Sequence, residues 1–390
     1  ANIDNNITNQ EMIGLYHNIR WSKYKARVFS AMHNLASSNN KHVDFYQIAD
    51  TDGQRKSLSS VDLNFHQYPH KLLFAGSYDD VPQWILFKTL FKSVYTSDAS
   101  LILIPGFHRP EYWGMLLAAL LTRTKRAVFC DSTIYDQPQS FLKGLLKRLF
   151  FSLCHGFFVY GVRAKAYVVH YGAPPDKVFF RCQAAALPHD YSTDLALAHR
   201  IAQAPHADAP RFLYVGRLSP EKSLDVLVQA FAQVHHVQPA ATLVLVGAGP
   251  HRQALEDQAN AAGLGQAVIF TGSKDVEALA AEYARATCLV LPSFSEPWGL
   301  VVNEALAYGC PVVVSYRCGC VPELVENKPT GFVFEAQNVD ELASKLLAAP
   351  AAFADVKTTA IQCIELIAQY SPQAAAEDIL AGCEKILAAH

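Results

Sequence analysis

Two basic residues bracket a turn in the segment 216–222, whose sequence is GRLSPEK. A short apolar run ends where this segment begins, and Ser219 followed by Pro220 predicts the start of a helix. Lys222 then falls in the first helical turn, where the helix dipole disfavours a cation. A bound anion would reverse that penalty, because Arg217 and Lys222 would both face it. A diphosphate fits such a doubly basic strand–helix turn; two solvated surface cations are the alternative.

Two glutamates occur in a second segment, 291–304, with the sequence LPSFSEPWGLVVNE. Glu296 is expected in a loop after a strand, and Gly299 lets the backbone approach a ligand closely. Glu304 is expected one turn into a nearly all-apolar helix over residues 300–308, where an acid needs a partner. A vicinal diol, such as that of a ribose, could donate two hydrogen bonds to it. Acids also favour helix starts for purely structural reasons.

The elements around these segments alternate between short apolar runs and helical patterns. In the C-terminal half the expected strands are 211–216, 241–247, 267–270, 288–291 and 311–314. In the N-terminal half they are 11–16, 101–104 and 127–130. Such alternation predicts parallel sheets covered on both faces, which bind ligands beyond the carboxyl ends of their strands. We expect the domain boundary in 183–210, a stretch rich in Ala, Pro and His.

Bulk composition limits the class of protein. A chain of 390 residues predicts two domains, and a net charge of −2 gives no global attraction to nucleic acid. The nine cysteines are odd in number and lack zinc-finger spacing, so we expect free, mostly buried thiols in a reducing compartment. The chain shows no secretory signal and no apolar run long enough to cross a bilayer. These features predict a cytoplasmic protein that is at most peripheral to a membrane.

The segments 216–222, 246–250 (VGAGP) and 291–313 strongly resemble the retaining family 4 glycosyltransferases. The resemblance runs continuously from about residue 211 to 347. It implies the GT-B fold: two Rossmann-like, doubly wound α/β domains that face each other across a cleft. Residues 1–190 would form the acceptor-binding domain and residues 205–371 the donor-binding domain. A last helix, at about 372–390, would pack back on the first domain.

The resemblance also implies roles for individual residues. Arg217 and Lys222, after the strand that ends at Gly216, would bind the donor diphosphate and stabilise the leaving nucleotide. Glu304 would hold the ribose hydroxyls. Glu296 would contact the donor sugar. The remaining implied donor contacts are backbone amides around Trp298, Gly299 and Leu300, and the base-binding turns at Gly247, Gly249, Gly272 and Lys274.

The N-terminal half departs from the family pattern. Where many members carry a glycine pair after the first strand, residues 17–24 read HNIRWSKY, without glycine. The family often places a His or Asp after a strand of this half, facing the donor sugar. Asp131 and His108 are the two candidates, with a capping or loop role as the alternative for each.

Residues 141–153 form a basic amphipathic pattern, with leucines on one helical face and Lys143, Lys147 and Arg148 elsewhere. We expect the leucine face to lie in the core of the N-terminal domain. Contact with an anionic membrane is the alternative, because basic amphipathic helices bind such surfaces.

The resemblance implies a retaining hexosyltransferase that uses a UDP- or GDP-linked sugar. The acceptor would be a hydroxyl of a glycan or lipid-linked molecule in bacterial polysaccharide or glycolipid synthesis. No cofactor or metal is expected, because cationic side chains can replace a metal at a diphosphate and no convincing Asp-x-Asp motif is present.

Two other functions stay open: a GT-B-like nucleotide-sugar epimerase, and a catalytically silent sugar-nucleotide-binding subunit. An NAD-dependent dehydrogenase is disfavoured, because Gly247-Ala-Gly249 lacks the full dinucleotide-binding context.

Overall fold

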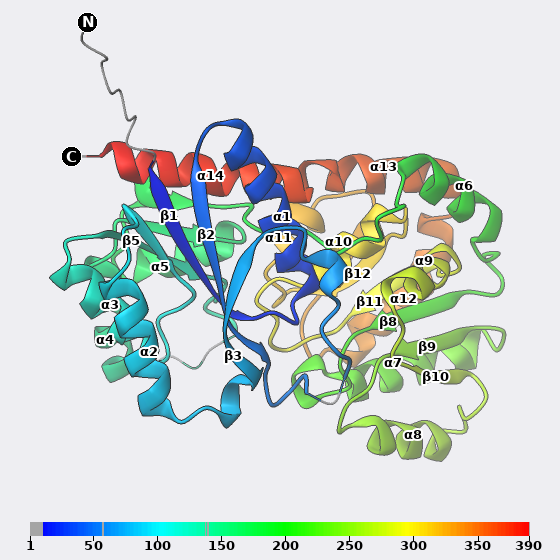
Figure 1. Cartoon of the computed structure of the whole chain (residues 1–390). Coiled ribbons are helices and arrows are strands. Elements are labelled where there is room, and N and C mark those ends of the chain that lie inside the picture. The colour runs from blue at the N-terminus through cyan, green and yellow to red at the C-terminus, as the bar shows by residue number, and fades with distance from the viewer. Residues whose placement is uncertain (1–10, 57, 137, 139, 390) are drawn as a thin grey trace, which may run out of the picture.

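The computed structural model describes residues 11–389, apart from residues 57, 137 and 139. Two parallel sheets, each covered by helices, form two domains side by side (Figure 1). The N-terminal sheet has the order β3-β2-β1-β4-β5-β6-β7 and the C-terminal sheet β10-β9-β8-β11-β12-β13. Both orders reverse direction after a domain's first strand, and ligands bind at such switch points. The expected fold, two Rossmann-like domains of the GT-B type, is confirmed.

The strands are short and mostly buried. Those of the N-terminal sheet are β1 (Met12–Ile19), β2 (His42–Thr51), β3 (His70–Ser77), β4 (Leu101–Ile104), β5 (Lys125–Cys130), β6 (Gly156–Val159) and β7 (Val178–Phe179). Those of the C-terminal sheet are β8 (Arg211–Val215), β9 (Thr242–Val246), β10 (Val268–Gly272), β11 (Cys288–Leu291), β12 (Val312–Ser315) and β13 (Gly331–Phe334). Continuous apolar runs, as in β11 and β12, are typical of strands covered on both faces.

The helices follow the strands in alternation. Those of the N-terminal half are α1 (Lys23–Ser38), α2 (Gln83–Tyr95), α3 (Pro110–Leu121), α4 (Phe141–Ser152) and α5 (Val162–His170). The later ones are α6 (Thr193–Gln203), α7 (Leu224–Val237), α8 (Arg252–Ala261), α9 (Val276–Ala284), α10 (Leu300–Ala307), α11 (Val321–Leu324), α12 (Val339–Ala352), α13 (Val356–Ile367) and α14 (Pro372–Ala388).

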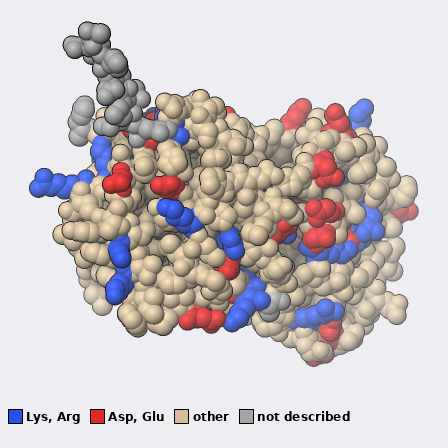
Figure 2. Space-filling view, in the orientation of Figure 1, with Lys and Arg blue, Asp and Glu red and all other residues tan. Residues whose placement is uncertain are grey.

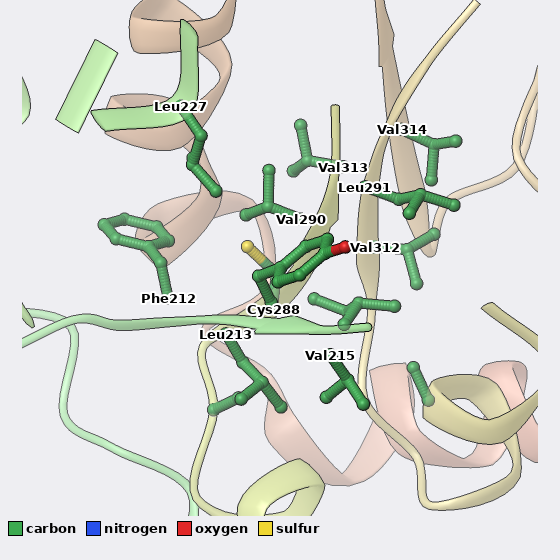
Figure 3. Close-up of a cluster of buried hydrophobic side chains, with 14 of the residues drawn as sticks. Phe212, Leu213, Val215, Leu227, Cys288, Val290, Leu291, Val312, Val313 and Val314 are labelled. Carbon is green, nitrogen blue, oxygen red and sulfur yellow. The ribbon is translucent and has the colours of Figure 1, made fainter. Parts of the chain in front are cut away.

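Each domain has its own apolar core. In the C-terminal domain, Phe212 of β8 and Val290 of β11 pack with Leu227 of α7, and Val313 lies on the neighbouring strand (Figure 3). The N-terminal sheet separates two clusters: α2 to α5 cover one face, and α1 and α14 cover the other. All nine cysteines are free and buried, as the sequence predicts.

Helix α14 lies on the N-terminal domain although it follows the C-terminal domain in sequence (Figure 1). It packs against α1, and Ile379 and Cys383 are fully buried there. Lys125 of β5 donates hydrogen bonds of 3.0 Å to the carbonyl oxygens of Ile386 and Leu387. The last helix therefore completes the cover of the N-terminal sheet.

The segment 183–210 contains α6, a helix that the sequence pattern did not indicate. Helix α6 contacts α9 and α13 of the C-terminal domain. Arg200 of α6 is buried and donates to the carbonyl oxygens of Tyr283 and Ala284, both at 3.1 Å. The C-terminal domain therefore begins at α6.

The expectation that the leucine face of α4 lies in the core is wrong. Leu142, Leu145, Leu146 and Leu149 are 71%, 50%, 54% and 51% exposed. Helix α4 is anchored instead by its C-terminal end, where Phe150 and Phe151 are buried. The ring of Phe150 lies 5.0 Å from that of Trp113 in α3. The leucines precede this anchor and point away from the sheet.

Candidate active site

Arg217 lies directly after β8, in a turn that ion pairs hold in place. Its guanidinium donates to Glu221 Oε1 at 2.6 Å and to Ser219 Oγ at 3.2 Å. A third bond, 2.6 Å to Gln54 Oε1, reaches the loop after β2 in the other domain. Burial by itself would raise the pKa of Glu221, but hydrogen bonds from Ser219 and Arg217 lower it to about 2. The turn therefore holds a fixed, ionised pair.

Lys222 pairs with Glu296, which links the two segments that the sequence singled out. The backbone brings them together, because Phe294 N donates to the Glu221 carbonyl oxygen at 2.9 Å. Lys222 lies in a helical turn, as the sequence predicts, but this turn is a short 3-10 helix and not the first turn of the following α-helix. Residues 220–222 form a separate 3-10 turn, and Ser223 then adopts a left-handed conformation with φ 52° before α7 begins. The Ser219 hydroxyl likewise bonds to Glu221 and makes no cap.

The Glu296 loop is held by a second segment, residues 318–320. Gly319 N donates to the Glu296 carbonyl oxygen at 3.1 Å, and Cys320 N to the Trp298 carbonyl oxygen at 3.1 Å. A Cβ atom on Gly319 would lie 1.7 Å from the Pro297 carbonyl oxygen, so only glycine allows this approach. The loop then enters α10 through Gly299, which has φ 102°.

Trp298 and Leu300 flank that entry to α10. The Trp298 side chain is buried and donates to Asn303 Oδ1 at 2.8 Å, so its indole belongs to the core. Leu300 is partly buried against the same core as the first residue of α10. Only the backbone of these two residues can serve the predicted donor contacts.

Glu304 has the partner that an acid in an apolar helix requires. Tyr283 of α9 donates its hydroxyl to Glu304 Oε2 at 2.7 Å. Burial nevertheless raises the pKa of Glu304 to about 7, with the Tyr283 bond opposing the rise. The rings of Tyr283 and Tyr308 stack at 5.5 Å beside it. A ligand that donates hydrogen bonds would favour the ionised form of this carboxyl.

A cleft of about 450 Å³ lies at the carboxyl ends of β8, β9 and β10. The predicted residues Gly216, Arg217, Gly247 and Lys274 line it. Lys274 Nζ also donates to Glu282 Oε1 at 2.6 Å, and the same carboxylate pairs with Arg211 and Arg285.

The glycines of this region pack backbone against backbone. A Cβ atom would lie 1.8 Å from the Gly216 carbonyl oxygen if added to Gly247, and 2.2 Å from that of Leu218 if added to Gly249. Gly272 turns the chain with φ 75° just before the cleft-lining Ser273. Gly249 and Gly272 therefore do not line the cleft themselves, but they determine the path of the backbone that lines it.

The sequence did not indicate the wall that the N-terminal domain adds to this cleft. Trp21, between β1 and α1, and Lys23, the first residue of α1, line it with Leu58 and Ser59. Trp21 Nε1 donates to the Ser59 carbonyl oxygen at 3.1 Å, which fixes the indole against the loop after β2. The available signal for this wall was the sequence of residues 17–24, which lacks the glycines of the family pattern and carries the large side chain of Trp21.

Asp131 and His108 lie together at the carboxyl ends of β5 and β4. Both line a cavity of about 530 Å³ and an adjoining one of about 180 Å³. Burial, followed by the charge of Arg109, lowers the pKa of His108, so its imidazole is neutral at pH 7. Pro297 of the C-terminal domain lines the larger cavity as well, which places Asp131 across from the Glu296 loop.

Direct contacts join the Asp131 loop to the C-terminal domain. Ser295 Oγ donates to the Asp136 carbonyl oxygen at 3.2 Å, and Arg317 donates to that of Tyr135. Asp136 Oδ1 in turn accepts from Thr133 N at 2.6 Å. The cavity beside Asp131 and His108 is therefore bounded by the loop that carries Glu296, through Pro297.

Within residues 11–389, the three undescribed positions aside, no group of three or more His, Cys, Asp or Glu side chains is placed to hold a metal ion. The chain contains one Asp-x-Asp triplet, at residues 50–52. Its carboxylates are paired, Asp50 with Arg20 at 2.6 Å and Asp52 with Arg55. None of the described helices combines the length and apolarity needed to cross a membrane.

Known proteins are similar to the part of the chain that carries Arg217, Lys222, Glu296 and Glu304. The family model of the glycosyl transferases group 1 matches residues 198–349, which include the whole C-terminal half of the site. A sulfoquinovosyl transferase of Arabidopsis thaliana is 34% identical over 142 residues, 36% of this chain and 26% of that protein. A GDP-mannose-dependent phosphatidylinositol monomannoside mannosyltransferase of Mycobacterium tuberculosis is 33% identical over 143 residues, 35% of this chain and 37% of that protein. The matches thus span about a quarter to two fifths of these relatives.

Similarity over the whole chain is structural. The crystal structure of the Anabaena protein HepE in complex with UDP and glucose has a TM-score of 0.69 to this chain at 17% identity. The alignment covers 96% of this chain and 99% of that one, which extends the shared fold to the N-terminal domain. Together these findings show similarity to glycosyltransferases over residues 198–349 and the GT-B fold over nearly the whole chain.

Proposed function

We propose that this chain is a retaining family 4 glycosyltransferase that moves a hexose from a nucleoside diphosphate sugar to a hydroxyl group. The observation that carries the proposal is the Lys222–Glu296 pair beside Arg217. Two fixed cations suit a diphosphate, and the adjacent carboxylate suits the hydroxyls of a sugar. The match to the glycosyl transferases group 1 contains all three residues.

In this reaction the bond between the anomeric carbon and the diphosphate oxygen breaks, and the acceptor oxygen bonds to that carbon on the same face. The acceptor proton passes to the departing phosphate oxygen. Arg217 and Lys222 stabilise the negative charge that develops on the diphosphate, which is their main catalytic contribution. Glu296 holds the sugar and orients Lys222, so no protein nucleophile is required. Cations in this position make a metal ion unnecessary.

The donor nucleotide is uridine- or guanosine-based. The cleft below β8 to β10 offers Trp21 for stacking and Val276 and Leu279 as apolar contacts, while Glu304 accepts from the ribose. HepE was crystallised with UDP, and the mycobacterial relative is GDP-mannose-dependent. Thermal shifts with UDP, GDP, ADP and CDP identify the base, because a nucleotide that binds only the folded protein raises its unfolding temperature.

Transfer is tested with radiolabelled UDP- and GDP-hexoses and a membrane lipid extract as acceptor. We expect free nucleoside diphosphate together with label in the lipid or glycan fraction, in the presence of EDTA. Label that stays nucleotide-linked with a changed sugar configuration would indicate an epimerase. Donor binding without turnover would indicate a binding subunit. Loss of transfer on adding EDTA, restored by magnesium, would overturn metal independence.

The acceptor is lipid-linked, and α4 docks on an anionic membrane. Phe141 is 81% exposed and continues the four exposed leucines, while Lys143 and Arg148 are exposed between them. No acidic residue occurs between Asp136 and Asp176 in the sequence, so the charged side chains of α4 itself are all basic. Leu146 and Lys143 also line the larger cavity beside Asp131, which connects the membrane surface to the acceptor site. We place the enzyme in the cytoplasm, at the inner face of the membrane.

Vesicle sedimentation tests this docking. We expect binding to phosphatidylglycerol vesicles and little binding to phosphatidylcholine vesicles. The double variant Leu145→Glu/Leu149→Glu should bind at least about tenfold more weakly, because each charge must enter the apolar boundary. Leu195→Glu, at a leucine 55% exposed on α6, is the matched control and should bind as before. Equal binding of the double variant and the wild type would contradict the proposal.

A further inference from the structure

A small chamber of about 180 Å³ in the N-terminal domain adjoins the larger cavity. The two share the walls formed by His108, Phe129 and Asp131. The rest of the chamber is mainly aromatic, with Tyr24 and Tyr160 among its walls. It lies at the carboxyl ends of β1, β4, β5 and β6, where parallel sheets bind ligands.

Lys25 is a buried cation in this chamber, only 8% exposed. Its Nζ atom lies 4.9 Å from the ring centre of Tyr160 and 5.1 Å from that of Phe129. Considering the described residues alone, no acceptor lies within hydrogen-bond distance of this ammonium, and no carboxylate lies within ion-pair distance. Contacts with ring faces compensate a buried charge only in part.

The helix that carries Lys25 adds to this imbalance. Lys25 is the third residue of α1, where the helix dipole disfavours a cation. Ser22, at the N-cap, accepts no capping hydrogen bond with its side chain. The amide groups of this first turn therefore add positive potential to that of the ammonium. A bound anion would reverse both effects at once.

The neighbours of Lys25 do not supply that anion. Burial lowers the pKa of His17 to about 3, so its ring is neutral, and it bonds to Gln47 Oε1 at 2.9 Å. Asp131 is the one acidic residue among the described residues that line the chamber, and it is exposed at the entrance. Burial lowers the pKa of Lys25, and the charge of Asp131 opposes this.

We propose that Lys25 binds a small oxyanion, a carboxylate or a phosphate, that a substrate carries into this chamber. The site is separate from the diphosphate turn of Arg217 and Lys222, which belongs to the other domain. The identity of the molecule that carries the oxyanion rests on the proposed glycosyltransferase function. Binding of the oxyanion itself does not.

Calorimetric titration with inorganic phosphate tests the site without any turnover. The protein used carries Arg217→Ala and Lys222→Ala, so that the diphosphate turn no longer binds the probe. We expect millimolar binding of one phosphate, at least tenfold weaker after Lys25→Met, which keeps the length of the side chain. Lys88→Met, at an exposed lysine of the same domain, is the matched control and should leave binding unchanged. Lys25→Gln is the second variant if Lys25→Met does not fold.

Absence of phosphate binding, or binding that Lys25→Met leaves unchanged, would overturn the proposal. Steady-state kinetics in the otherwise wild-type enzyme then identify the carrier. A KM raised at least tenfold for the acceptor alone assigns the oxyanion to the acceptor, and one raised for the donor alone assigns it to the donor sugar. Lys25-dependent phosphate binding without any sugar transfer would retain the site and reject the proposed function.

Discussion

The two domains share one architecture but hold their cleft-facing cations differently. In the C-terminal domain, Arg217 and Lys222 are paired with Glu221 and Glu296. In the N-terminal domain, two lysines that line the cavities, Lys25 and Lys147, lie against aromatic rings. Lys147 is the second example after Lys25, with Nζ 4.7 Å from the ring centre of Tyr171. Figure 2 shows basic and acidic side chains interspersed over the face turned to the viewer.

The difference indicates two ways of preparing a site for an anion. A paired cation is held in place before the ligand arrives, and its carboxylate is free to take up another contact afterwards. A cation on an aromatic ring is also held in place, but its charge stays largely uncompensated until a ligand binds. The C-terminal site suits a diphosphate that arrives and leaves in every turnover. The N-terminal site, with its uncompensated lysine charge, attracts an anion until one binds.

Removing a paired cation should have the largest effect. Lys222→Ala should lower kcat about 10²- to 10³-fold, because it removes stabilisation of the charge that develops on the leaving diphosphate. Lys147→Met should lower activity less than tenfold and act mainly through the KM for the acceptor. Both are measured as initial rates of transfer at saturating donor. Lys357→Ala, at an exposed lysine of α13, is the control. Equal losses for Lys222→Ala and Lys147→Met would remove the distinction between the two sites.

Disturbing the contact between the two domains at Gly161 should have the next largest effect. A Cβ atom on Gly161, at the start of α5, would lie 2.0 Å from Glu323 Oε2 and 2.6 Å from the Trp298 ring. Gly161→Ala should therefore destabilise the protein by about 1–3 kcal/mol, because both neighbours belong to the other domain. Thermal unfolding measures the change. An unchanged unfolding temperature would show that this contact does not contribute to the interface.

Nucleotide affinity should depend on pH through Glu304. Its pKa of about 7 in the folded protein lies above the ordinary 4.5, so the folded state holds the extra proton more tightly than the unfolded state. That contribution to stability is complete below pH 4.5 and is lost as the pH rises through 7. In the proposed function the ribose binds the ionised carboxylate, so nucleotide affinity should rise about tenfold from pH 6 to pH 8. Glu304→Gln should weaken binding at pH 8 and flatten the profile. If Glu304→Gln showed the same pH profile as the wild type, a group other than Glu304 would be responsible for the titration.

The smallest effect is expected at Gly144, within α4. A Cβ atom there would lie 3.4 Å from the Tyr171 ring, an ordinary contact. Gly144→Ala should stabilise the protein by about 0.5–1 kcal/mol, because alanine loses less backbone entropy in a helix. Chemical denaturation measures this gain and contrasts it with the loss at Gly161. Destabilisation by Gly144→Ala would instead indicate that the backbone of α4 is strained at this position.

The sequence was most informative where chemistry and local structure coincide. The strand–turn positions of Arg217, Lys222 and Glu296 follow from short motifs, and so does the partner that Glu304 requires. What the motifs lacked was long-range pairing. Lys222 and Glu296 lie 74 residues apart, and their ion pair does not follow from either motif alone.

The N-terminal side was less predictable for a physical reason. The period of its leucines gives α4 an apolar face but does not determine what covers that face, because burial depends on the position of the whole helix. Lys25 showed no sequence signal of its own, since a lysine near a helix start is ordinary on a surface. Its significance comes from Phe129 and Tyr160, which follow it by more than 100 residues.

The position of α14 has a consequence for biosynthesis. The ribosome finishes the strands of the N-terminal sheet well before it makes the helix that covers one of their faces. Residues 193–367, in contrast, are contiguous and can fold as soon as they emerge. Until α14 arrives, Phe158 and Leu103 lack part of their cover and are open to chaperones or to wrong partners. The N-terminal domain is therefore synthesised first but completed last. The time needed to translate the C-terminal domain determines how long the uncovered face of the N-terminal sheet stays exposed.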